Sequence, residues 1–238
     1  MWLAMDTATD RASVALGVPG ESPIEESIGG ARRHAAELLP AVQRLLHQAG
    51  ASLDDLRGVA LSDGPGSFTG LRVGAAVAKA LVYARKIPLW TAPSLLVRAA
   101  GVASHNGLVL SVANALRGEV YAAAYRFSPG EIQTELIPSV RRPEELVSST
   151  LRPDIIVGEA SPEVLAILEG WAGRPVIGPP EGSPRAALLL DLLGRKRGGR
   201  EILEVREWEP VYGRPAEAQA RWESVHGRPL PDSVGSPR

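Results

Sequence analysis

The sequence predicts an α/β protein of two lobes that share one plan, each lobe holding a mixed β-sheet and helices. Three short apolar segments separated by turn residues occur near the start of the chain and again after residue 107, and segments with helical spacing follow each set. The 238 residues, 45% of them hydrophobic, are enough for two modest cores. We therefore expect a duplicated architecture.

The first lobe is expected to open with a three-stranded antiparallel meander, because Thr9-Asp10-Arg11 and Pro19-Gly20 separate its apolar segments. Its strands are expected at 2–8, 13–18, 24–28 and 58–62. Apolar residues three and four apart predict a helix at 33–48, in which Pro40 should cause a bend or leave one carbonyl unpaired. Further helices are expected at 52–55, with a cap at Ser52, and from the glycine-rich loop to about Arg85.

The second lobe is expected to repeat the meander and then to alternate helices with a strand. The expected strands are 108–113, 119–127, 132–140 and 155–157, the first two forming a hairpin. The expected helices are 143–148, 162–169 and 184–195. We expect lobes at 1–104 and 105–213, with the last helix packing back on the first lobe. A flexible tail is expected at 214–238, where Trp222 is the one residue that suggests the tail docks on the protein. This plan is typical of the actin, Hsp70 and sugar-kinase-like (ASKHA) superfamily.

Composition excludes several classes of protein. The 26 basic and 27 acidic side chains nearly cancel, so no overall field draws the chain to nucleic acid or to a lipid surface. The absence of cysteine excludes disulfide scaffolds, thiolate zinc sites and cysteine nucleophiles. The first residues do not resemble a signal peptide. A turn at 104–107 interrupts the uncharged segment 99–116, which we interpret as the end of a helix, a turn and a strand. We expect a cytoplasmic protein with no membrane segment.

The segment Gly64-Pro-Gly-Ser-Phe-Thr-Gly70 lies between an expected strand and an expected helix, where backbone N–H groups can hold an anion. Its sequence does not match the P-loop motif G-x-x-x-x-G-K-[ST], because Thr69 and not glycine stands five residues after Gly64 and no lysine follows Gly70. It does not match the dinucleotide-binding motif G-x-G-x-x-G either. The alternative is a tight turn in which Ser67 or Thr69 caps the helix. Small residues along 70–80 would let a second helix approach that helix closely, in this chain or in a partner.

The segment Gly64-Pro-Gly-Ser-Phe-Thr-Gly-Leu-Arg-Val-Gly74 resembles the most recognisable motif of the TsaB (YeaZ) family. Other segments resemble the family in the same order along the chain: 3–9 with 13–16, 33–40 including Pro40, 118–121 and 209–214. One departure is Asn114, where the family usually has an aspartate. The amide keeps a hydrogen-bond acceptor and loses the charge, which is a mild change if the residue only braces the hairpin.

The resemblance implies a non-catalytic scaffold that dimerises with TsaD in the complex that makes N6-threonylcarbamoyladenosine at tRNA position 37. In that family TsaE joins the pair, TsaC supplies threonylcarbamoyl-adenylate, and TsaD transfers the group, so ATP and metal are expected on partner subunits and no cofactor on this chain alone. The tRNA is reached through the complex, and a homodimer is possible in isolation. The expected interface residues are His34, Leu38, Val42, Leu45, Gly64, Pro65, Gly66, Ser67, Phe68, Thr69, Gly70, Arg72, Val73, Gly74 and Val77.

The resemblance places Asp6, Thr7 and Thr9 where active members of the superfamily hold nucleotide phosphates, but no glycine is present in this turn, so we expect only a vestigial nucleotide site. TsaD carries a His-x-x-x-His metal pair. Here the residue four after His34 is Leu38, so we expect no metal site and no catalytic residue.

Two alternatives remain. One is a small-molecule kinase or ATPase of the same fold, with Asp6 or Asp63 as base. The other is a glycoprotease-like peptidase, for which the sequence shows no catalytic constellation.

Overall fold

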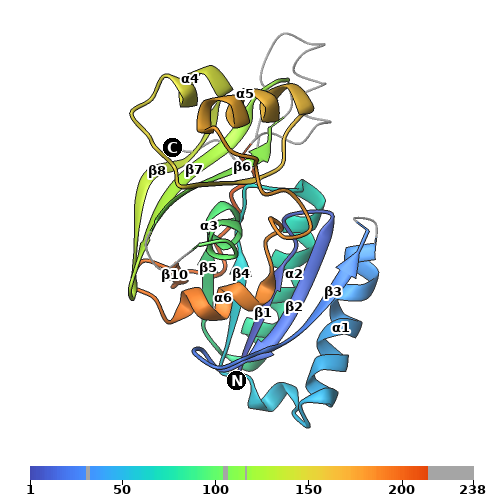
Figure 1. Cartoon of the computed structure of the whole chain (residues 1–238). Coiled ribbons are helices and arrows are strands. Elements are labelled where there is room, and N and C mark those ends of the chain that lie inside the picture. Colours follow the sequence, from blue (N-terminus) through green and yellow to red (C-terminus); the bar gives the residue numbers. More distant parts are fainter. Residues whose placement is uncertain (31–32, 104–106, 116, 214–238) are drawn as a thin grey trace.

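The computed structural model describes residues 1–30, 33–103, 107–115 and 117–213, and it has two mixed β-sheets (Figure 1). Within these residues the first sheet has the strand order β10-β5-β4-β1-β2-β3 and the second the order β8-β7-β6-β9. The strands of the first sheet are β1 (Trp2–Asp6), β2 (Arg11–Gly17), β3 (Ile24–Gly29), β4 (Gly58–Ser62), β5 (Leu89–Ala92) and β10 (Arg200–Ile202). Those of the second are β6 (Gly107–Asn114), β7 (Val120–Ser128), β8 (Glu131–Arg141) and β9 (Ile155–Gly158).

The two sheets repeat one topology. In the first, β3, β2 and β1 form an antiparallel meander and β4 pairs in parallel with β1, starting at Trp2 opposite Gly58. In the second, β8, β7 and β6 form the meander and β9 pairs in parallel with β6, starting at Val109 opposite Ile155. The duplicated α/β fold expected from the sequence, with a mixed sheet in each of two lobes, is confirmed.

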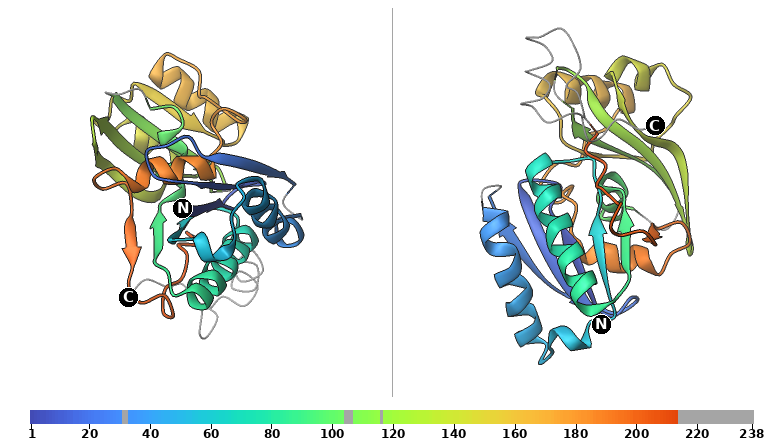
Figure 2. Two further views of the ribbon diagram at one scale, coloured as in Figure 1. Left: turned by 90° about the horizontal axis from the view of Figure 1, so that it is seen from below. Right: turned by 180° about the vertical axis from the view of Figure 1, so that it is seen from behind.

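Helices and sheets stack in five layers (Figures 1 and 2). Helices α1 (His34–Gln48) and α2 (Phe68–Arg85) lie side by side on one face of the first sheet and share a core with it. Helices α3 (Ser94–Ala100) and α6 (Ala186–Leu193) lie between the two sheets. Helices α4 (Pro143–Val147) and α5 (Pro162–Ala172) cover the outer face of the second sheet.

The middle layer joins the two lobes. Helix α6 packs on β1, β2 and β4, where Ala4, Ala15 and Ala60 present small side chains and allow close approach. The same core contains Tyr125 and Phe127 of the second sheet. The chain thus returns from the second lobe to the first, as expected for its last helix, and β10 then adds to the edge of the first sheet.

Most expected elements are present within a few residues of the predicted bounds, and the capping box at Ser52 is confirmed beside the 3-10 helix Leu53–Asp55. The prediction missed β5 and β10, which have four and three residues and are too short to show a periodic pattern. Of α3 it gave only the end of a helix before the turn at 104–107. Helix α1 continues through Pro40. Pro40 has no N–H for the carbonyl of Ala36, which lies on an exposed turn that water reaches.

Two expectations lie outside the described residues: the lobe boundary at Ser104 and the tail at 214–238 with Trp222. Among the described helices, none is long and apolar enough to cross a bilayer.

Candidate functional site

The glycine-rich loop connects β4 to α2, and its backbone N–H groups bond within the chain. Gly64 N–H donates to Ser94 Oγ at 2.9 Å, and Ser67 N–H donates to the Ala8 carbonyl at 2.7 Å. Ser67 Oγ accepts the Gly70 N–H at 3.3 Å, so Ser67 is the helix cap that the turn interpretation predicted. These three donors are not available to an anion, which favours the turn over a phosphate cradle.

The glycines of this segment face the chain itself. A Cβ on Gly66 would lie 2.3 Å from the Ala8 carbonyl oxygen, and one on Gly70 would lie 2.0 Å from that of Thr7. A Cβ on Gly74 would lie 2.4 Å from Thr7 Oγ1. Gly64 has φ +104°, and a Cβ on it would lie 2.1 Å from the Val211 carbonyl oxygen. The expectation that these glycines form a docking face is therefore corrected, because they let α2 approach the β1–β2 turn and the segment at 211.

A continuous face of α2 is nevertheless open to solvent. Its exposed side chains recur at steps of three and four: Thr69, Arg72, Ala76, Ala80, Tyr83 and Ala84, with half-buried Val73 and Val77 among them. Tyr83, with 54% of its surface exposed, was not among the expected interface residues. Pro65 is buried in the loop. Of the expected residues here Phe68, Thr69, Arg72, Val73 and Val77, with part of Gly66 and Ser67, reach the surface.

Helix α1 contributes a different face from the expected one. Leu38, Val42 and Leu45 are at most 2% exposed and pack into the core between α1, α2 and the first sheet, so their assignment to an interface is corrected. His34 is also buried, with Nε2 3.3 Å from the Asp10 carbonyl oxygen. Leu39, 50% exposed, lies one residue and therefore about 100° away from Leu38 around the helix. Sequence spacing had grouped Leu39 with the apolar stripe, because it lies three residues before Val42 and seven before Leu46, and its exposure corrects that grouping.

At the N-terminal end of α2, an aromatic and cationic cluster joins the helix to the segment that follows β10. The Arg72 guanidinium lies 4.2 Å from the Phe68 ring centre and 5.7 Å from that of Tyr212. The two rings are 4.8 Å apart. Two turns further along, Lys79 pairs with Glu209 at 3.4 Å. Sequence spacing suggests the Phe68–Arg72 pair at i and i+4, but only the fold brings Tyr212 to it.

A cavity of about 270 Å³ opens where the two lobes meet. Its lining includes Thr9 and Asp10 of the β1–β2 turn, Gly66 and Ser67 of the loop, Ser94 and Arg98 of α3, and Asn114, Tyr121 and Glu159 of the second lobe. Arg98 is 3% exposed, donates to the Val112 carbonyl at 2.6 Å and forms an ion pair with Glu159 at 2.9 Å. Arg98 thus ties α3 to the second sheet.

The expected vestigial nucleotide residues do not form a phosphate grip. Asp6 and Thr7 are fully buried and do not line the cavity. Asp6 Oδ1 accepts the Ala8 N–H at 3.2 Å, and burial raises the pKa of the Asp6 carboxyl. Thr9 lines the cavity, but its hydroxyl bonds within its own turn to the Arg11 carbonyl at 3.1 Å. The assignment of Asp6 and Thr7 to a nucleotide site is corrected because neither side chain is accessible.

Asp63, the other candidate base of a kinase, is 4% exposed and also lies outside the cavity lining. Its Oδ2 accepts the Thr91 hydroxyl at 2.9 Å, and burial raises the pKa of its carboxyl. Among the residues that the structure describes, no three side chains of His, Asp or Glu are grouped to hold a metal.

Comparison with known proteins first defines the broad class. A family model described as TsaD, tRNA N6-adenosine threonylcarbamoyltransferase, matches residues 24–160, which is more than half of the chain. The solved structure of YeaZ from Pseudomonas aeruginosa superposes with a TM-score of 0.71 at 29% identity, covering 89% of this chain and 98% of that one. The chain is therefore a two-lobed α/β protein related in sequence to that transferase family.

Full-length relatives narrow this class. The tRNA threonylcarbamoyladenosine biosynthesis protein TsaB of Escherichia coli (strain K12) is 31% identical over 88% of this chain and 93% of that protein. The protein of the same name from Bacillus subtilis (strain 168) is 30% identical over 92% of this chain and 96% of its own length. The chain belongs to the TsaB (YeaZ) family.

Proposed function

We propose that this chain takes part in making threonylcarbamoyladenosine in tRNA as a non-catalytic subunit that pairs with TsaD, using the exposed face of α1 and α2. The observation that carries the proposal is the accessible row of small and apolar side chains on these helices, with Leu39 on α1 and Ala76, Val77, Ala80 and Tyr83 on α2. Helices with small side chains can pack at short interaxial distance, so this face suits another helical pair.

Two further observations support a scaffold. The buried carboxyls of Asp6 and Asp63 do not reach the cavity between the lobes, so neither is placed as a base for a substrate there. The relatives that match nearly the whole chain are named as threonylcarbamoyladenosine biosynthesis proteins. In the proposal ATP, metal and the transfer chemistry belong to partner subunits, TsaE joins the pair, tRNA is reached through the complex, and the work takes place in the cytoplasm.

The test compares two exposed alanines. Ala76→Arg places a charge in the middle of the α2 face, whereas Ala166→Arg makes the same change on α5, on the outer side of the second lobe. Affinity for TsaD of the same organism is measured by titration calorimetry, with melting temperature as the check on folding. We expect Ala76→Arg to weaken binding at least about tenfold, because a desolvated unpaired charge is costly at an interface, and Ala166→Arg to bind like the wild type.

Wild-type protein that does not bind TsaD, or Ala76→Arg protein that binds it unchanged, would contradict this interface. The same face would serve a homodimer of the isolated chain, so light scattering should show less self-association for Ala76→Arg. The kinase alternative predicts micromolar binding of ATP with magnesium by the chain alone, for which we expect no measurable heat.

A further inference from the structure

Arg72 stands at one end of the exposed α2 face in a fixed orientation. Phe68, one turn earlier on the same helix, places its ring 4.2 Å from the guanidinium, and Tyr212 approaches at 5.7 Å. Stacking on rings uses the faces of the guanidinium plane, and its N–H donors lie along the edges. Arg72 also makes a side-chain hydrogen bond to Tyr212. The rings and this bond hold the cation in place, and the remaining N–H donors of the guanidinium are left for a carboxylate.

All charged side chains of α2 are basic, and Arg72 is the one that forms no ion pair with an acid of the described residues. The helix contains Arg72, Lys79 and Arg85 and no Asp or Glu. Lys79 pairs with Glu209 at 3.4 Å, and Arg85 pairs with Asp54. Arg72 makes no ion pair with any acid in the described part of the chain. A cation held in place beside an apolar docking face calls for an acid on the surface that covers that face.

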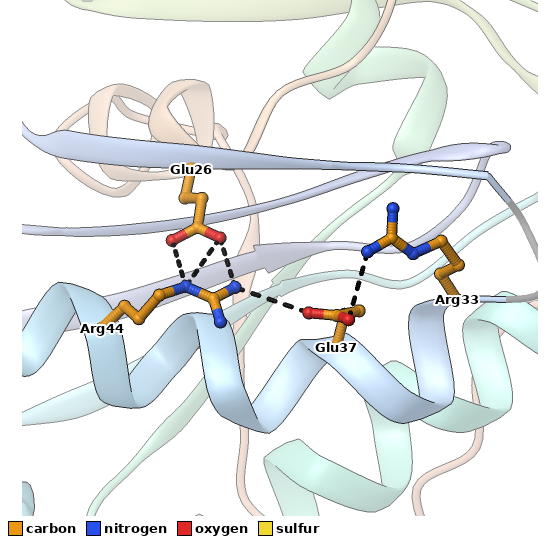
Figure 3. Close-up of polar contacts among 4 residues, drawn as sticks. All are labelled: Glu26, Arg33, Glu37 and Arg44. Carbon is orange, nitrogen blue, oxygen red and sulfur yellow. Dashed lines mark hydrogen bonds and ion pairs between the residues drawn. The ribbon is translucent and has the colours of Figure 1, made fainter.

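A second copy of this chain does not supply that acid from the same helices. Glu37 is the one acid that α1 and α2 contain. Its carboxylate already lies between Arg33, at 3.2 Å, and Arg44, at 3.7 Å, and Arg44 also binds Glu26 (Figure 3). The network has two acids and two bases and is internally neutral, so a homodimer through these helices would bury Arg72 without a matching charge.

We infer that Arg72, clamped by Phe68 and Tyr212, donates hydrogen bonds to a carboxylate carried by a helix of a different protein, and thereby favours that partner over self-pairing. This rests on the proposed function, since it assigns the chemistry of the partner on the same face. Nucleic acid is the weaker candidate, because the neighbouring cation Lys79 is neutralised by Glu209 and one arginine does not form a phosphate-binding track.

The test measures affinity for TsaD of the same organism at low and high salt. Arg72→Glu should weaken binding about 100-fold, because like charges then face each other, and Arg72→Lys about tenfold, because the planar fork is lost. The salt dependence of binding should fall in both. Arg152→Glu is the matched control, an exposed arginine after α4 that should leave affinity unchanged.

The clamp is tested separately. Tyr212→Leu removes a ring and should weaken binding and reduce its salt dependence. Tyr212→Phe keeps the ring and loses only the hydroxyl that bonds to Arg72 and Glu209, so it should weaken binding less than Tyr212→Leu. If wild-type protein does not bind TsaD, the proposed function and this inference fail together. If wild type binds and Arg72→Glu binds equally, this inference alone fails. It fails as well if Arg72→Glu instead abolishes a homodimer, or lowers affinity for tRNA with TsaD binding intact.

Discussion

Gly70, in the first turn of α2, lies so close to the β1–β2 turn that a Cβ on it would be 2.0 Å from the carbonyl oxygen of Thr7. This approach, repeated at Gly66 and Gly74, explains why the segment is rich in glycine. The loop and helix are seated on the first hairpin of their own lobe. The surface left for a partner is the opposite side of α2.

The contact predicts a cost for one methyl group at Gly70. Gly70→Ala should lower the free energy of unfolding by about 2 kcal/mol or more, because backbone must shift to remove the overlap and the gain in helix propensity is only about 1 kcal/mol. Urea unfolding measures it. Gly170→Ala in α5 is the control: its Cβ would meet nothing within 4 Å, so the variant should be more stable by about 0.5–1 kcal/mol. Equal effects at the two sites would contradict the close approach.

Leu38 and Leu39 are neighbours with opposite environments, 1% and 50% exposed. Leu38→Ala should destabilise the protein by about 2–5 kcal/mol through loss of core packing. Leu39→Ala should change stability by no more than about 0.5 kcal/mol, and we expect it to weaken TsaD binding because the side chain lies on the proposed interface. Thermal unfolding and calorimetry separate the two. A stability loss at Leu39 as large as at Leu38 would refute this orientation of α1.

Burial of Asp6 predicts a pH dependence of stability. The pKa of its carboxyl is raised by burial, so between the unfolded value, about 3.9, and the higher folded value the native state binds more protons. The contribution of Asp6 to stability therefore falls as pH rises through that window. Asp6→Asn keeps an acceptor for the Ala8 N–H, and its stability relative to wild type should rise from pH 4 upward, as measured by urea unfolding at each pH.

The Asp55 carboxyl predicts a pH dependence of stability with the opposite sign. Hydrogen bonds from the Ser52 backbone N–H and hydroxyl lower the pKa of the Asp55 carboxyl. That stabilisation is present above the unfolded pKa and is lost as pH falls through the folded one, so the deficit of Asp55→Asn should shrink in acid. The same direction of pH dependence in both variants would contradict these environments.

The element pattern was predictable where the chain is locally regular. The two meanders, α1, α2 and α5 follow from apolar periodicity and from turn residues, and the cap at Ser52 follows from its own four residues. Elements held by neighbours rather than by local pattern were missed. β5 and β10 pair with each other at the edge of the first sheet, and their seven residues carry no periodic signal.

The sequence predicted which two helices form the candidate surface, but not which side of each helix is exposed. The sequence singled out the segment that ends at Gly74 and the helix before β4, and both helices do lie together on one face of the first sheet. Which side of each helix is open depends on what packs against it. The glycines turned out to face Thr7, Ala8 and Val211, and Leu38 to face the sheet.

The duplicated α/β plan, the glycine-rich turn and the family follow from the amino-acid sequence, because each depends on local spacing or on motifs in order along the chain. The environment of Arg72 follows from the folded chain alone. Tyr212 is 140 residues away in sequence and reaches Arg72 because Val211 N–H bonds to the Asp63 carbonyl at 2.7 Å and Trp208 packs into the α2 core. Contacts of this separation are fixed by the packing of whole layers, which no single segment encodes.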